Sequence, residues 1–173
     1  MVTLADQSRA VPLPPSEAAP ATAGMEELLS FRVDERLYAV ALRELKRVAP
    51  LVAFEPAIQA PETVLGTFVC AGEPVTACEV RQRLGHGPRP LCLTDRLLVL
   101  HGSSGAWAIA VQEVLGVVQS GPHSSASAAE LGVVVPGLAA VTRQGAGLVP
   151  VLNLESLLTP AERAFIAAQG ADR

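Results

Sequence analysis

Apolar residues recur in short runs along the chain, and one pattern of these runs occurs twice. The segment LLSFRVDERLYAVALRELKRV at 28–48 returns at 97–117 as LLVLHGSSGAWAIAVQEVLGV. The apolar positions of the first copy keep their spacing in the second, and Tyr38 and Trp107 fall on equivalent sites. Such self-similarity predicts two copies of one supersecondary unit that pack together.

A second echo follows each copy of this pattern. The segment VLGTFV…VTACEVRQRL at 64–84 is answered by VPGLAA…VPVLNLESLL at 135–158, so that Gly66 pairs with Gly137 and Leu84 with Leu158. The repeat therefore extends through most of the chain after residue 24, and we expect the two copies to share one fold.

The short apolar runs are separated by Gly, Pro, Asp and Ser, which is typical of strands joined by turns. The pattern predicts an all-β fold with short helical segments at 79–84 and 154–158 and a polar loop at 119–130. Predicted strands cover 27–33, 36–42, 64–70, 74–80, 96–101, 106–111, 113–118, 133–142 and 147–152.

The two ends of the chain differ in character. Residues 1–24 are rich in Ala and Pro and lack an apolar period, which favours a disordered arm, so the folded domain is expected at 25–170. At the other end, Thr159 as N-cap, Pro160 at the first helical position and Glu162 as the capping-box acid predict a helix. Ala161, Phe165 and Ala168 are expected to face the body of the protein.

Composition narrows the classes of function. The formal net charge is −4 and no basic patch is visible, so nucleic acid is not an expected partner. No apolar run reaches the ~20 residues that a spanning helix needs, so no membrane insertion is expected. Three irregularly spaced cysteines suit a reducing cytoplasm better than a disulfide framework.

The sequence offers few groups for catalysis or metal binding. Cys78, His86 and Glu79 are the residue types of a nucleophilic catalytic triad, but residues adjacent in sequence rarely assemble one. A zinc site from Cys70, Cys78, His86 and Cys92 lacks the paired short spacings of structural sites. We expect Cys70 and Cys78 to be small core residues. The prediction is therefore no enzyme, no metal and no cofactor, and the glycines of GAGLVP at 145–150 indicate a hairpin turn.

Four blocks together resemble the CheW family over about 25–169, namely LLSFRVDERLYAVALRELKRV, VLGTFVCAGEPVTACEVRQRLG, WAIAVQEVLGVV and GLAAV…LVPVLNLESLLTPAE. The resemblance implies two packed five-stranded SH3-like barrels with short helices and a C-terminal helix. It also implies a non-catalytic, cytoplasmic adaptor, recruited to membrane receptor arrays, that couples chemoreceptor tips to the regulatory domain of the histidine kinase CheA.

The chain departs from the family pattern where the family's partners bind. Ala71 replaces a usual Arg, Val69 an Asn and Thr76 a Pro, and Arg47 stands where Glu is frequent. We therefore expect binding to a CheA-type kinase and only weak binding to a chemoreceptor tip. The alternative is a structural or inhibitory module that binds the kinase without coupling it to receptors. The resemblance places the candidate partner-binding groove between the two barrels, at Leu45, Arg47, Val64, Leu65, Gly66, Ala71 and Gly72.

For Gly66 and Gly72 the competing interpretation is structural, namely core packing and turn geometry. Glycine is the residue that accepts close backbone contacts and positive φ, so its presence in a groove is not by itself evidence of binding. The two readings differ in what they expect of the surroundings of each glycine.

Overall fold

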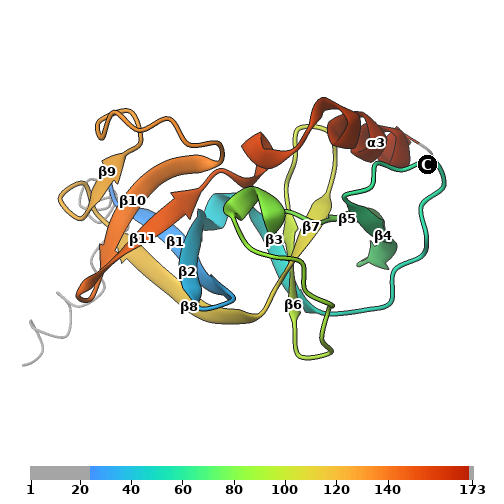
Figure 1. Cartoon of the computed structure of the whole chain (residues 1–173), viewed down its shortest axis with the longest axis horizontal. Helices are drawn as coiled ribbons and strands as arrows, with labels where there is room; N and C mark the ends of the chain where they lie inside the picture. The colour runs from blue at the N-terminus through green and yellow to red at the C-terminus, as the bar shows by residue number, and fades with distance from the viewer. Residues whose placement is uncertain (1–23, 172–173) are drawn as a thin grey trace, which may run out of the picture.

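The computed structural model describes residues 24–171, which form two mixed β-sheets side by side and a C-terminal helix over the second (Figure 1). All but the last residue of the predicted arm at 1–24 lies outside the described residues. The first sheet contains β1 (Glu26–Val33), β2 (Arg36–Ala41), β8 (Glu113–Ser120), β9 (Ser125–Ser127), β10 (Leu138–Gln144) and β11 (Gly147–Leu152). The second contains β3 (Leu45–Pro50), β4 (Val64–Cys70), β5 (Glu73–Cys78), β6 (Arg96–Leu100) and β7 (Trp107–Val111).

The two sequence copies exchange strands between the sheets. The strand order is β8-β1-β2-β11-β10-β9 in the first sheet and β3-β6-β7-β5-β4 in the second. Each sheet thus takes its two central strands, β1–β2 or β6–β7, from one copy and the flanking strands from the other. The equivalent strands of the repeat therefore occupy equivalent places in the two sheets.

The strand registers confirm the repeat at residue level. Leu28 pairs with Ala41 in the first sheet, and the equivalent Leu97 pairs with Ala110 in the second. In both sheets the two copies meet through a short parallel ladder, between β11 and β2 or between β5 and β7.

Three apolar clusters form the core, and the largest contains residues of both sheets. Phe31, Tyr38, Leu98 and Trp107 belong to this shared cluster, whereas Leu28 belongs to a smaller cluster on the opposite face of the first sheet. Neighbouring residues of a strand point to opposite faces. The central strands are therefore apolar on both faces, which explains the continuous runs LLSF and LLVL.

The predicted all-β fold class is confirmed, with differences in detail. The first sheet has six strands because the predicted polar loop at 119–130 contributes β9. Strand β3 was not predicted, because the adjacent charged residues Lys46 and Arg47 break the apolar alternation. Four of its six residues, Lys46–Val48 and Pro50, are exposed. The strand predicted at 133–142 begins only at Leu138. Of the segment 79–84, only η2 (Gln82–Leu84) is helical, and η3 (Leu154–Leu157) matches the second prediction.

The C-terminal helix α3 (Pro160–Ala171) begins as predicted. The Thr159 amide donates to Glu162 Oε2 at 2.7 Å and the Glu162 amide donates to Thr159 Oγ1 at 3.2 Å, which is a capping box. The predicted buried face was wrong, because Ala161 and Ala168 are exposed and Phe165 is half-buried. Glu162 and Ile166 face the body instead. No helix within residues 24–171 is long and apolar enough to span a bilayer.

Candidate functional site

Cys78 and its sequence neighbours do not form a nucleophilic site. Cys78 lies in the shared core with 1 % of its surface exposed, and burial, reinforced by the charge of Glu162, raises the pKa of its thiol to about 12. Glu79 accepts a hydrogen bond from the Arg81 amide at 2.6 Å. A protonated thiol inside an apolar core is not a nucleophile at neutral pH.

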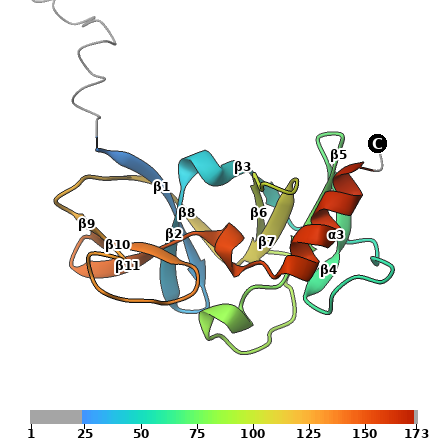
Figure 2. The same cartoon turned by 90° about the horizontal axis from the view of Figure 1, so that it is seen from above.

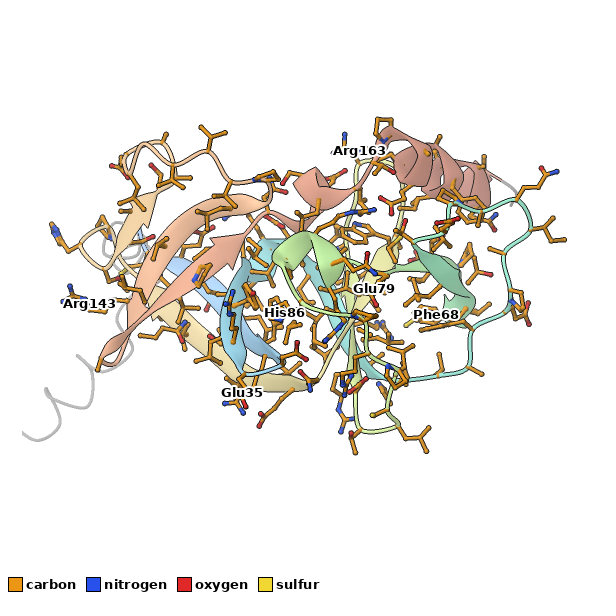
Figure 3. All side chains as sticks on the ribbon, in the orientation of Figure 1. Glu35, Phe68, Glu79, His86, Arg143 and Arg163 are labelled. Atoms are coloured by element: carbon orange, nitrogen blue, oxygen red, sulfur yellow. The ribbon has the colours of Figure 1, made fainter. Side chains whose placement is uncertain are left out.

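His86 is held in a chain of polar side chains. Its Nε2 lies 2.7 Å from Tyr38 Oη and its Nδ1 lies 2.9 Å from Asp34 Oδ2, while Arg81 donates to Asp34 Oδ1 at 2.7 Å. The hydrogen bond from Arg81 lowers the pKa of Asp34, with smaller contributions from His86. The labelled His86 and Glu79 lie between the two sheets (Figure 3). Both ring nitrogens of His86 therefore take part in hydrogen bonds. This hydrogen-bond network joins the β1–β2 hairpin to the segment after β5.

The four residues considered as zinc ligands differ in burial and in hydrogen bonding. Cys78 is buried, Cys70 is half-buried and Cys92 is exposed, and His86 is engaged as described. Across residues 24–171 no three His, Cys, Asp or Glu side chains are grouped as a metal site would require.

A second polar cluster fixes α3 to the body. Arg83 donates to both Glu162 oxygens, at 2.9 and 2.6 Å, and to the Leu157 carbonyl at 2.9 Å. Thr63 Oγ1 also donates to Glu162. Burial raises the pKa of Glu162, but the hydrogen bonds from Arg83, Thr63 and the Thr159 amide outweigh it, so the pKa is lowered. This carboxylate is fully buried and ionised, and its role is structural.

Ala71 and Gly72 form the exposed two-residue turn between β4 and β5. Their φ angles are +49° and +81°, as in type I′ turns, which need positive φ at both central residues. An added Cβ at Gly72 would meet nothing within 4 Å. Turn geometry therefore accounts for Gly72, and Ala71 occupies a backbone conformation that L-residues seldom adopt.

The other predicted groove residues divide between core and surface. Gly66 is buried at φ +146°, and a Cβ there would lie 2.6 Å from the Glu55 carbonyl oxygen, so core packing accounts for it. Leu45 and Val64 pack on the shared core and Leu65 on the core of the second sheet. These side chains stabilise the fold, and only part of their surface is available to a partner.

The exposed part of the predicted groove lies at one end of the second sheet. Strands β3 and β4 are its opposite edges, and an ion pair between Lys46 and Glu73 joins β3 to the hairpin that carries Ala71. Arg47 is exposed on β3. Arg47, Ala71 and Gly72 are thus exposed on a strand and a hairpin tip that this ion pair links.

An apolar groove lies on the first sheet and was not predicted. Its volume is about 610 Å³, and its lining comes from the starts of β2 and β11, from η2 and from the residues before β10. The run Val133–Val135 lies beside the groove and is exposed. The sequence pattern predicted it as part of a strand, which would have placed its valines in a core. A sequence signal existed in this run, but it does not distinguish a buried strand from an exposed loop.

Comparison with known proteins gives a consistent result. Residues 27–162 match the family described as CheW-like domain. A solved structure, the scaffolding protein TtCheW from Thermoanaerobacter tengcongensis, superposes with a TM-score of 0.70 at 15 % identity, over 79 % of this chain and 94 % of that one. A search of curated proteins finds no match. The structural likeness at this identity concerns the fold.

Proposed function

The chain belongs to the family of CheW-like domains, and from this premise we propose that it is a non-catalytic adaptor of a bacterial chemosensory complex. The match over 27–162, which covers both sequence copies, is the observation that carries the proposal. The side chains with reactive potential support it, because Cys78 is buried and His86 and Glu162 are engaged in structural hydrogen bonds. Such a protein works through its surfaces.

The partners follow from the family. We infer that the chain docks in the cytoplasm on the regulatory domain of a CheA-type kinase, which resembles CheW in fold, and so joins arrays of membrane receptors. Interfaces of this kind use an apolar centre with a polar rim. The chain offers exposed apolar side chains on the sheet edges, such as Val48 on β3 and Leu115 and Val117 on β8.

Receptor binding is the part of the function in which this chain differs. Ala71 stands on an exposed turn where the family usually has Arg, and it provides no donor beyond the backbone. Arginine grips carboxylates and carbonyls with a planar fork of donors, and losing such a charge-assisted contact lowers affinity about tenfold or more. Weak binding to a receptor tip is the consequence, with kinase binding less affected.

Titration of a chemoreceptor-tip fragment against wild type and Ala71→Arg tests the proposal. We expect the substitution to strengthen binding by about tenfold, because the turn keeps its geometry and regains the fork of donors. Ala146→Arg is the matched control, since Ala146 is exposed in the β10–β11 turn of the other sheet. This control should leave receptor binding unchanged.

Three other results would alter the conclusion. Tight wild-type binding that Ala71→Arg leaves unchanged or weakens would contradict the loss of receptor contact. Kinase-domain binding without receptor binding in either variant would favour the structural or inhibitory module, which the changes at the exposed Arg47, Val69 and Ala71 also support. Failure to bind the kinase domain at all would overturn the adaptor proposal.

A further inference from the structure

The apolar groove on the first sheet exists because two strands separate. The ladder between β2 and β11 comprises only Val151↔Ala39 and Leu152↔Val40, so the first three residues of β2 and the first four of β11 precede it. Those leading residues line the groove together with Leu84 of η2 and Val135. An opening between two inner strands of the sheet therefore exposes side chains of an otherwise packed molecule.

The second sheet has an equivalent surface, and there the chain covers it with its own helix. The starts of β5 and β7 correspond by the repeat to the starts of β11 and β2. Helix α3 packs on β5, and a Cβ added at Gly105, just before β7, would lie 3.2 Å from Ile166 Cγ2. Both views show α3 at the β4–β5 end of the molecule, away from β9–β11 (Figure 1, Figure 2).

The first sheet lacks such a cover within the described chain. Helix α3 follows η3, whereas η2, the equivalent of η3, is followed by residues 85–95, which contain no helix and lead to β6. The groove contains Arg36 where the covered surface has Gly105, and Leu148 where it has Pro74. Leu148 is 70 % exposed and Val134 is 98 % exposed. Leu148 therefore remains an exposed apolar side chain of the uncovered surface.

The chemistry of the groove identifies its occupant. Helix α3 meets its surface with Glu162, Phe165 and Ile166, the i, i+3, i+4 spacing with which an amphipathic helix fits a groove. At the groove entrance Arg36 has no ion-pair partner among residues 24–171, so it is available to a carboxylate. The protein's own α3 is not available, because Arg83 and Thr63 hold its Glu162.

We propose that this groove docks an amphipathic helix of a partner protein, with its apolar stripe against Leu84, Val135 and Leu148 and an acidic residue of its first turn against Arg36. The helix would occupy on the first sheet the place that α3 occupies on the second. This site is separate from the Ala71 turn, which lies on the other sheet, so the proposal does not depend on which receptor or kinase the protein serves.

The test uses the full chain and a synthetic amphipathic helix as probe. The peptide has 12 residues, the length of α3, with leucines at i, i+3, i+4 and i+7 and glutamates in the first turn. We expect saturable binding, measured by fluorescence anisotropy, that Leu148→Glu weakens at least about tenfold, since it places a charge in the apolar contact. Arg36→Glu should weaken it by a smaller factor, and a peptide with glutamates replaced by lysines should bind less well.

Ile58→Glu is the matched control, because Ile58 is 88 % exposed and does not line the groove. Melting temperatures establish that Leu148→Glu, Arg36→Glu and Ile58→Glu are folded. Equal binding by wild type and Leu148→Glu, equal binding of a scrambled peptide, or no binding at all would overturn the proposal. Two further results would also overturn it. One is a self-association that Leu148→Glu abolishes, which assigns the groove to a second copy; the other is binding only after removal of residues 1–23, which assigns it to that segment.

Discussion

At the residue scale, Gly66 and Gly137 show why the repeat keeps glycine at one position. Both have positive φ, +146° and +81°, and both lie where a Cβ would collide. At Gly66 the obstacle is the Glu55 carbonyl oxygen at 2.6 Å, whereas at Gly137 it is the Leu157 side chain at 2.5 Å. Backbone cannot move aside as readily as a leucine methyl group, so the two glycines are not equally replaceable.

Substitution by alanine tests this difference. We expect Gly66→Ala to lower the free energy of unfolding by about 3 kcal/mol, because a backbone clash is added to an unfavourable φ. Gly137→Ala should lower it by about 1–2 kcal/mol, since Leu157 can adjust its rotamer. Gly145→Ala, at φ +59° in open space, is the control for the φ effect alone and should lower it by about 1 kcal/mol. Urea unfolding measures all three, and equal losses at Gly66 and Gly145 would contradict the clash.

At the element scale, a single buried carboxylate determines how α3 sits. Glu162 is fully buried and accepts hydrogen bonds from Arg83, Thr63 and the Thr159 amide. Arg83 forms a hydrogen-bonded ion pair with Glu162 on the side of the helix that faces the body. Glu162 and Ile166 are therefore buried, whereas Ala161 and Ala168 are exposed to solvent. The capping box was evident from local spacing, but the rotation of the helix depends on a residue far away in the sequence.

Glu162→Gln should lower the free energy of unfolding at pH 7 by about 3 kcal/mol, because it leaves the Arg83 charge without its carboxylate. The folded-state pKa of Glu162 is lowered, so its stabilisation is complete above the unfolded-state pKa of about 4.3 and is lost as pH falls through the folded value. The difference between wild type and variant should therefore shrink below about pH 4.

Chemical denaturation at both pH values measures this effect. Glu113→Gln is the control, because Glu113 and Arg32 form an exposed ion pair and its loss should change stability by less than about 1 kcal/mol. If the difference between Glu162→Gln and wild type were the same in acid as at neutral pH, the charge of Glu162 would not be the source of its contribution.

At the scale of the whole molecule, the exchange of strands makes the two copies interdependent. Strands β1 and β2 of the first copy lie between β8 and β11 of the second, and β6 and β7 lie between β3 and β5. Neither half contains a complete sheet, and the largest apolar cluster draws side chains from both halves. The unit of folding is therefore the pair of copies, although each copy resembles a domain in sequence.

Division of the chain between Pro88 and Arg89, in the loop before β6, tests this interdependence. We expect fragments 1–88 and 89–173 each to lack a cooperative thermal transition by circular dichroism, since each alone exposes the faces that the other covers. Mixed in equal amounts, they should associate and recover the transition and the dispersed NMR spectrum of the intact chain. A cooperative melt of either isolated fragment would show that one copy can complete a sheet by itself.

Sequence by itself determined the features that depend on spacing along the chain. The repeat, the equivalence of Tyr38 and Trp107 and the capping box at Thr159 all follow from local patterns. Alternation, turn residues and caps act between near neighbours, so their signals survive without knowledge of the fold. The resemblance of four sequence blocks to the CheW family then predicted the arrangement of the strands in two packed units.

Only the tertiary structure decided which strands of the two copies pair with each other and which apolar surface no other segment covers. His86 was an isolated polar residue in the sequence, and its partners Asp34 and Tyr38 come from a distant hairpin. The groove beside Leu148 exists because β2 and β11, which are far apart in the chain, separate before their short ladder. Parallel pairing and burial between distant segments leave no local period, since a side chain's environment depends on which segments the chain brings beside it.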